Sequence, residues 1–274
     1  MIKYNKYINN FANEAKYKTY INGSVAEVPN TALIDDTGKM IYTKILPNNY
    51  VMFGTTKGTQ DFKIGQSSDK YSNADCIQIH VVVEDDSGIN KMYVAPEDVL
   101  KIPKYFYSNN SGFNTTEGKK ILSISKWKID TSNAVSTERM FVACSSLISL
   151  DFSNFKSSNV TNISNMFNGC SKLTNLDLTS FDLSKVTDMG GIFYDCKKIN
   201  KLYLSSSFFN STSLTTYDFS ELYNWKDTES LAMFVEAVTA HNGTGKTVKL
   251  STNTKNTLTT EQKTAITNAG WTIA

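Results

Sequence analysis

The chain has 274 residues, 40% of them apolar, and its 28 lysines and arginines against 26 aspartates and glutamates leave a formal net charge of +2. That length allows one large domain or two to three small ones, and the near-neutral charge gives no strong attraction to nucleic acid or to a membrane surface. No apolar run approaches the roughly 18–20 residues of a membrane span, so we expect neither membrane insertion nor nucleic acid as a partner.

Residues 1–48 are expected to form an N-terminal segment of one helix and one β-hairpin. A polar helix is predicted over residues 9–21. Two short apolar stretches then flank an Asp-Asp-Thr-Gly-Lys turn within residues 32–42, a layout typical of a hairpin in which Gly38 supplies a positive φ.

This order of a short helix, a proline-containing strand at residues 26–30 and a hairpin ending at Tyr42 resembles the N-termini of virion structural proteins from phages of Bacteroidetes. The resemblance covers residues 10–44. It implies an anchor that docks a fibre or decoration protein onto other virion proteins. The first residues lack the apolar stretch of a secretory signal, so we expect the chain to reach its site by assembly; a processed fragment is the alternative.

Residues 49–118 are predicted to form a small β-rich module. Its best strand covers residues 76–83, a turn follows at residues 84–88, and residues 91–94 return as the partner strand. The aromatic residues that follow, within an Asn-, Ser- and Gly-rich stretch at 105–113, are interpreted as the link into the second half of the chain.

Residues 119–274 contain a motif that recurs every 26 residues. Met140-Phe141-Val142-Ala143-Cys144 returns as Met166-Phe167-Asn168-Gly169-Cys170 and again as Ile192-Phe193-Tyr194-Asp195-Cys196. A fixed period of this length is the mark of a solenoid, in which each coil buries its apolar side only against its neighbours. The copy that contains the first of these motifs, at residues 121–146, is weaker than the next two, and a further copy begins at Ile199 and then loses the pattern.

Each coil is expected to hold one short strand, around residues 150–152 in one copy and 176–178 in the next, where apolar and polar residues alternate. Residues 161–167 carry apolar side chains at i, i+3 and i+4, which predicts a short helix capped by Thr161 or Asn162. Stacked coils would then form a narrow parallel sheet on one face and a row of short helices on the other.

Residues 173–189 read Leu-Thr-Asn-Leu-Asp-Leu-Thr-Ser-Phe-Asp-Leu-Ser-Lys-Val-Thr-Asp-Met, which resembles the BspA-like leucine-rich repeats of bacterial surface proteins. The resemblance covers residues 121–210. It implies a leucine-rich-repeat solenoid used for adhesion or protein–protein contact, with no catalytic residues. The expected fold class is therefore α+β and multi-domain: a helix/hairpin anchor, a small β-rich module and a C-terminal leucine-rich-repeat (α/β) solenoid.

The end of the chain is interpreted as a cap of this solenoid. Helices are predicted over residues 229–238 and 259–266, the second of them starting with a capping threonine. Strands are predicted over residues 246–250 and 271–273. Terminal repeats are expected to diverge from the others because one of their sides must face water.

Three of the four cysteines, Cys144, Cys170 and Cys196, occupy one repeat position, and the fourth is Cys76. Cysteine packs as a small apolar residue, so we expect the three to form a buried ladder; a disulfide between adjacent coils is the alternative. The two histidines have no metal-ligand spacing, and we expect no metal and no cofactor.

Three motifs have a catalytic or metal-binding alternative. Residues 240–247 differ from a phosphate-binding P-loop only at their first position, but a helix precedes and a strand follows, the reverse of the P-loop order, so a turn is favoured. Asp36-Thr37-Gly38 matches an aspartic protease triplet in a single copy, whereas that chemistry needs two carboxylates. Asp85-Asp86 lacks the alternating oxygen ligands of a calcium loop. We therefore expect no enzyme.

The candidate binding residues lie on the strands of the coils and near the cap. Asp151 and Asp177 sit between apolar strand residues and should point outward, either as a binding face or, as we favour, to keep the strand edge soluble. The aromatic candidates for a patch that contacts sugar or protein are Tyr203, Tyr217, Tyr223 and Trp225. For each of these four residues taken singly, packing in the core or cap is favoured over a place in such a patch.

The expected function is that of a non-enzymatic phage virion protein, a fibre, decoration or head- or tail-associated protein. Its repeats would contact a host surface glycan, a host protein or a neighbouring subunit. Virion fibres are commonly symmetric, so a homo-oligomer is expected. The rival is a bacterial surface adhesin with leucine-rich repeats whose signal peptide has been removed, and an enzyme acting on polysaccharide is the least favoured reading.

Overall fold

The computed structural model describes residues 129–153 and 155–274, preceded by 32–34, 40–42, 51–57, 62–64, 77–82, 89–94, 100–101, 113, 116 and 118–124. The helix predicted at 9–21, the strand at 26–30, the turns at 35–39 and 84–88, and Cys76 lie outside these residues.

The first half of the described chain consists of short strands. They are β1 (Ala32–Ile34), β2 (Met40–Tyr42), β3 (Val51–Thr56), β4 (Phe62–Ile64), β5 (Ile77–Val82), β6 (Asn90–Val94) and β7 (Leu100–Lys101). β1 and β2 pair antiparallel, with Leu33 opposite Ile41, so the predicted hairpin is confirmed.

A six-stranded sheet joins this half to the repeats. Its order is β10-β8-β3-β6-β5-β4, where β8 is Ile121–Ile124 and β10 is Ser149–Leu150. β5 and β6 pair antiparallel, which confirms the two strands predicted at 76–83 and 91–94. β3 pairs antiparallel with β8, and β8 pairs parallel with β10. The first strand of the repeats is therefore hydrogen-bonded directly to the β-rich half.

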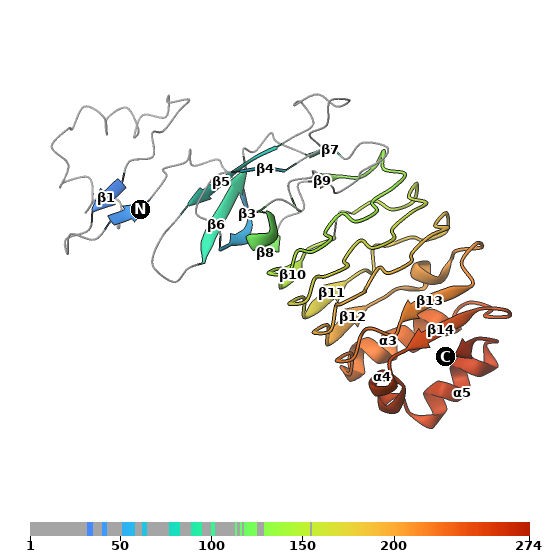
Figure 1. The fold of residues 1–274 in the computed structure, drawn as a ribbon. Helices are drawn as coiled ribbons and strands as arrows, with labels where there is room; N and C mark the ends of the chain where they lie inside the picture. The colour runs from blue at the N-terminus through green and yellow to red at the C-terminus, as the bar shows by residue number, and fades with distance from the viewer. Residues whose placement is uncertain are drawn as a thin grey trace.

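The repeats form coils that stack one on the next (Figure 1). β10 pairs with β8 through Ser149 opposite Ser123, and β11 (Asn175–Asp177) pairs with β12 (Lys201–Tyr203) through Asn175 opposite Lys201. Both pairs are parallel and join residues 26 positions apart (149 − 123 and 201 − 175). On another side of the stack β7 pairs parallel with β9 (Ile129–Asp130).

The side of each coil that was predicted to hold a short helix consists of turns instead, so that prediction was wrong. Arg139 and Asn165 have positive φ, at 58° and 55°, which interrupts an α-helix. The backbone amide of Arg139 donates to the carbonyl of Ser164 in the next coil, and that of Phe141 donates to Met166, at 3.0 and 2.9 Å. These amides are bonded between coils rather than to a carbonyl four residues earlier.

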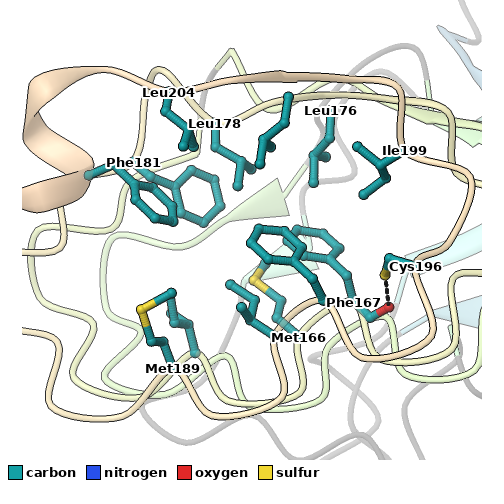
Figure 2. Close-up of a cluster of buried hydrophobic side chains, with 14 of the residues drawn as sticks. Met166, Phe167, Leu176, Leu178, Phe181, Met189, Cys196, Ile199 and Leu204 are labelled. Atoms are coloured by element: carbon teal, nitrogen blue, oxygen red, sulfur yellow. Dashed lines mark hydrogen bonds between the residues drawn. The ribbon is translucent and has the colours of Figure 1, made fainter. Parts of the chain in front are cut away.

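The interior of the stack is filled by the repeated apolar residues, which face each other from the strand side and the turn side (Figure 2). The phenylalanines of the turn side form a column. Phe141 stacks on Phe167 with ring centroids 5.9 Å apart, Phe167 on Phe193 at 6.2 Å, and Phe193 on Phe219 at 5.7 Å. Phe155 and Phe181 stack at 4.4 Å. Burial of the repeated apolar positions is thereby confirmed.

Strands and helices of altered length end the chain, beyond the last coil in Figure 1. These elements are the 3-10 turn η5 (Ser206–Phe209), β13 (Thr216–Phe219), α3 (Thr228–Thr239), β14 (Thr247–Leu250), α4 (Thr252–Thr257), α5 (Thr260–Asn268) and β15 (Thr272–Ile273). Another 3-10 turn, η4 (Gly118–Lys120), directly precedes the first strand of the repeats. β13, β14 and β15 form a three-stranded parallel sheet.

The two helices expected in this region are confirmed as α3 and α5, and α4 was not predicted. Thr259 begins α5 with a capping box in which its hydroxyl accepts from the Gln262 amide. Asp227 caps α3 by accepting from the Ser230 amide, and its other oxygen lies 3.3 Å from the Lys201 Nζ of β12. The first helix of the cap is thus attached to the last strand of the coils.

Candidate binding surface

The two aspartates predicted on the strand side stabilise turns through side-chain hydrogen bonds. Asp151 Oδ1 accepts a hydrogen bond from the Ser153 amide at 2.9 Å. Asp177 is exposed, and its Oδ1 accepts from both the amide and the hydroxyl of Thr179, at 2.9 and 2.6 Å. In each case the carboxylate closes the corner that follows the strand, an Asx turn. This role needs no ligand and involves one oxygen of each carboxylate.

Tyr203 occupies the same position one coil further on. It is half-buried, and its hydroxyl donates to Glu229 Oε2 of α3 over 3.5 Å. The column that runs from Asp151 through Asp177 therefore ends at a tyrosine that contacts the cap.

Tyr217 and Trp225 are not surface residues, which corrects their interpretation as members of an exposed patch. Both side chains are fully buried. Tyr217 lies in β13 and packs against Phe209 and Trp271, with ring centroids 5.0 and 5.7 Å away. Burial raises the pKa of its hydroxyl from 10.0 to about 12.

Trp225 is buried between the sheet and the first helix of the cap. Its ring lies 5.2 Å from that of Phe234 in α3. Its indole Nε1 donates to Ser230 Oγ at 3.1 Å, so its one polar atom is satisfied inside the core. Packing in the cap, which was favoured for each aromatic candidate taken singly, is what the structure shows for these two.

Tyr223 is exposed as expected, and Tyr194 is an exposed aromatic that the sequence reading missed. Tyr194 follows the buried Phe193, at a position that holds Val142 and Asn168 in the two preceding copies. Because the residue type changes from copy to copy, the repeat pattern gave no reason to single it out. The available signal was that Ile192 and Phe193 fill the two apolar interior positions of this copy, so the residue after them is directed outward.

The three cysteines of the repeat are buried and not joined by disulfides, as predicted. Each thiol donates to a backbone carbonyl: Cys144 to Phe113, which precedes the first coil, and Cys170 and Cys196 to Phe141 and Phe167 of the preceding coil, at 3.3, 3.2 and 3.1 Å. Figure 2 shows the last of these bonds. Burial raises the pKa of Cys144 and Cys196 from 9.0 to about 12 and that of Cys170 well above 9.0.

The segment that resembles a P-loop is a turn, as expected, between α3 and β14. Its Lys246 donates to the carbonyl of Ser211 at 2.6 Å and lies over the ring of Trp271, 5.8 Å from the centroid. Gly243 is required there because an added Cβ would come within 2.2 Å of the Trp271 ring. The lysine is therefore part of the cap packing.

Within the described ranges, no three His, Cys, Asp or Glu side chains gather where a metal ion could bind. None of the helices in the described part of the chain has both the length and the apolar character needed to cross a bilayer.

Residues 107–233 match the model of a protein family described as "Mycoplasma protein of unknown function, DUF285". The match starts ahead of β8, includes the copies of the 26-residue repeat and ends within α3. It is compatible with the resemblance of these residues to repeat-containing bacterial surface proteins. No curated protein and no solved structure matches the chain.

Proposed function

We propose that the protein is a non-enzymatic contact protein, a leucine-rich-repeat solenoid whose outer faces bind a partner, and that it is a structural part of a phage particle. The observation that carries the proposal is the 26-residue register of the coils. Stacking of this kind uses the repeated apolar residues for the interior and leaves the other positions free to vary on a broad outer surface.

Several reactive side chains of the repeats and the cap have structural uses, which supports a non-enzymatic role. The thiolate is the nucleophilic form of cysteine, and the raised pKa values of the three buried thiols keep them protonated at neutral pH. Asp151 and Asp177 close turns, and Lys246 packs on Trp271.

The resemblance of residues 10–44 to N-termini of phage virion proteins supports the assignment to a particle. On this proposal residues 1–48 anchor the chain to other virion proteins, residues 49–118 form a connecting module, and the coils of residues 119–274 face outward. Copies of the chain would associate symmetrically around the anchor.

Mass spectrometry of purified particles tests this assignment. We expect peptides of the coils in intact particles at a constant ratio to the major capsid protein through successive density gradients. Absence of the chain from particles whose capsid proteins are detected would reject the virion role.

A bacterial surface adhesin is the second candidate, favoured by the family match, whose description names Mycoplasma, a cellular organism. Treatment of intact cells with a protease that does not enter them separates the candidates. Loss of the chain from intact cells, with a cytoplasmic protein retained as the control, would assign it to the cell surface.

A further inference from the structure

Two exposed tyrosines lie at the C-terminal end of the coil stack. Tyr194 is 58% exposed and Tyr223 is 42% exposed, whereas the aromatic residues on either side of them in the stack are buried in the core. We call the surface formed by Tyr194, Asp195, Lys197, Glu221 and Tyr223 the Tyr194–Tyr223 patch.

The register of the coils places Tyr223 beside Lys197, one 26-residue period earlier (223 − 197), and Lys197 follows Tyr194 by three residues in the same turn. Phe193 and Phe219 stack with ring centroids 5.7 Å apart, so the segment that follows Phe219 lies alongside the segment that follows Phe193. The side chain of Asn224 donates to the carbonyl of Lys197, so the residues before Asn224 lie against those around Lys197.

The three charged side chains of the patch, Asp195, Lys197 and Glu221, carry a net charge of −1. Lys197 Nζ lies 2.9 Å from Asp195 Oδ1. The pKa of Lys197 is raised, first by its hydrogen bond to Asp195 and further by the negative charges of Asp195 and Glu221. Beneath them, burial raises the pKa of the Cys196 thiol, and the charges of Asp195 and Glu221 add to that effect. The patch thus combines hydrogen-bonding charges with little net charge.

Both tyrosines are carried by a backbone that is held in place. The carbonyl of Tyr223 accepts from Asn253 Nδ2 at 3.0 Å, and its amide donates to Glu221 at 3.0 Å. The amide of Tyr194 donates to Gly191 at 3.0 Å, and its carbonyl accepts from Gly169 at 2.9 Å. A ligand that stacks on these rings would therefore order little of the chain, which favours binding.

We propose that the Tyr194–Tyr223 patch binds a neutral oligosaccharide, with its rings stacked on sugar faces and its charged groups hydrogen-bonded to sugar hydroxyls. The face of an aromatic ring carries partial negative charge and attracts the polarised C–H groups of a sugar ring. Carboxylates accept, and an ammonium donates, hydrogen bonds with hydroxyl groups. This inference rests on the proposed contact function and names its ligand class and its place on the coils.

The size of the patch favours a short glycan over a protein. A stable protein interface buries about 800 Å² per partner, contributed by about 20–30 residues. The patch offers two aromatic rings and three charged side chains, which suits a few sugar units.

The test uses the full-length chain and an array of defined neutral oligosaccharides of glucose, galactose, mannose and N-acetylglucosamine, followed by titration of the best ligand. The variants are Tyr194→Ala, Tyr223→Ala and the double variant, with Tyr194→Phe and Tyr223→Phe as matched controls that keep the ring. Ile148→Ala, at an exposed apolar residue of another coil, is the control for surface truncation.

We expect a neutral oligosaccharide to bind, each alanine variant to raise its Kd by roughly tenfold, and each phenylalanine and Ile148→Ala to stay within about threefold of wild type. Binding of no neutral oligosaccharide, or an unchanged Kd in the folded double alanine variant, would overturn the proposal. A chain found in particles or on cells that binds no such glycan would contradict this inference alone, whereas a chain absent from both would contradict the proposed function.

Discussion

At the scale of single residues, the turn side of the coils depends on left-handed backbone at two positions per coil. The first position is Arg139, Asn165 and Gly191 in successive coils, and the second is Ala143, Gly169 and Asp195, with φ between 55° and 78°. Such a conformation costs roughly 1–2 kcal/mol for a residue other than glycine. The inter-coil hydrogen bonds donated by the amides of Arg139, Ala143, Asn165 and Gly169 offset that cost.

Neighbouring glycines allow this cost to be measured. Gly191 has φ +64°, and a Cβ there would come within 2.6 Å of Asn165 Oδ1. We expect Gly191→Ala to lower the free energy of unfolding by about 1–2 kcal/mol. The matched control is Gly190→Ala, where φ is not left-handed and the nearest atom to an added Cβ lies 3.3 Å away. Equal urea midpoints for the two variants would contradict this assignment of strain.

Truncation of the phenylalanine column should be costly because its rings have no space to repack. Phe167 is fully buried between Phe141 and Phe193. We expect Phe167→Ala to lower the free energy of unfolding by about 3–5 kcal/mol in urea titrations. Tyr194→Ala, which truncates an exposed ring, should change it by less than about 0.5 kcal/mol. Similar losses for both variants would show that the column is not the core.

At the scale of elements, the turn segments show why residues 161–167 were wrongly predicted to be helical. Apolar side chains at i, i+3 and i+4 face one side of a helix, but they also face the interior when consecutive tight turns carry the chain around a coil. The pattern indicates which residues are buried, but it does not indicate which carbonyls accept hydrogen bonds from their backbone amides. Here Ile163 and Phe167 donate to Asp188 and Ile192 of the next coil, at 2.9 and 3.1 Å.

Because of the cysteine ladder, we expect the folded protein to become less stable at alkaline pH. The folded pKa values of Cys144 and Cys196, about 12, lie above the unfolded value of 9.0, so these thiols stabilise the fold fully below pH 9.0 and lose that effect as the pH rises toward 12. We expect a loss of about 3 kcal/mol from these two thiols between about pH 8 and about pH 10. Urea titrations at constant ionic strength measure it.

The control for this prediction is the Cys144→Ala/Cys196→Ala variant. It should be less stable than wild type at about pH 8 but should lose less of its remaining stability on going to about pH 10. A pH dependence as steep as that of wild type would assign the alkaline effect to other groups, among them Tyr217, whose pKa is also raised by burial.

At the scale of the whole molecule, the sequence was most informative where it repeats. The 26-residue spacing identified the buried positions, the strand in each coil and the burial of the three cysteines. Each assignment could be checked in the next copy, where the equivalent position carries the same type of residue. The cap has no second copy, so the burial of Tyr217 and Trp225 depended on an unrepeated arrangement of β13 and α3. The Tyr194–Tyr223 patch escaped notice because the residue type at the position of Tyr194 changes from copy to copy.

Modular stacking predicts that a complete coil can be removed. Deletion of residues 173–198 removes one period and joins Lys172 to Ile199, the equivalent of Leu173. We expect this variant to unfold cooperatively in urea, because neighbouring coils contact each other through equivalent surfaces. Deletion of residues 173–185, half a period, places apolar positions opposite outward ones and should abolish the cooperative transition. Loss of cooperativity in both variants would contradict stacking of equivalent coils.

Disulfide trapping of an outward pair on the strand side tests the 26-residue register most directly. Asn175 of β11 lies opposite Lys201 of β12. In Asn175→Cys/Lys201→Cys, mild oxidation of the folded protein should join the two new cysteines, as identified by peptide mapping, whereas Asn175→Cys/Lys198→Cys should stay reduced under the same conditions. A bond in the second variant and none in the first, with both proteins folded, would contradict the register on which the coils, the patch and the proposed contact function depend.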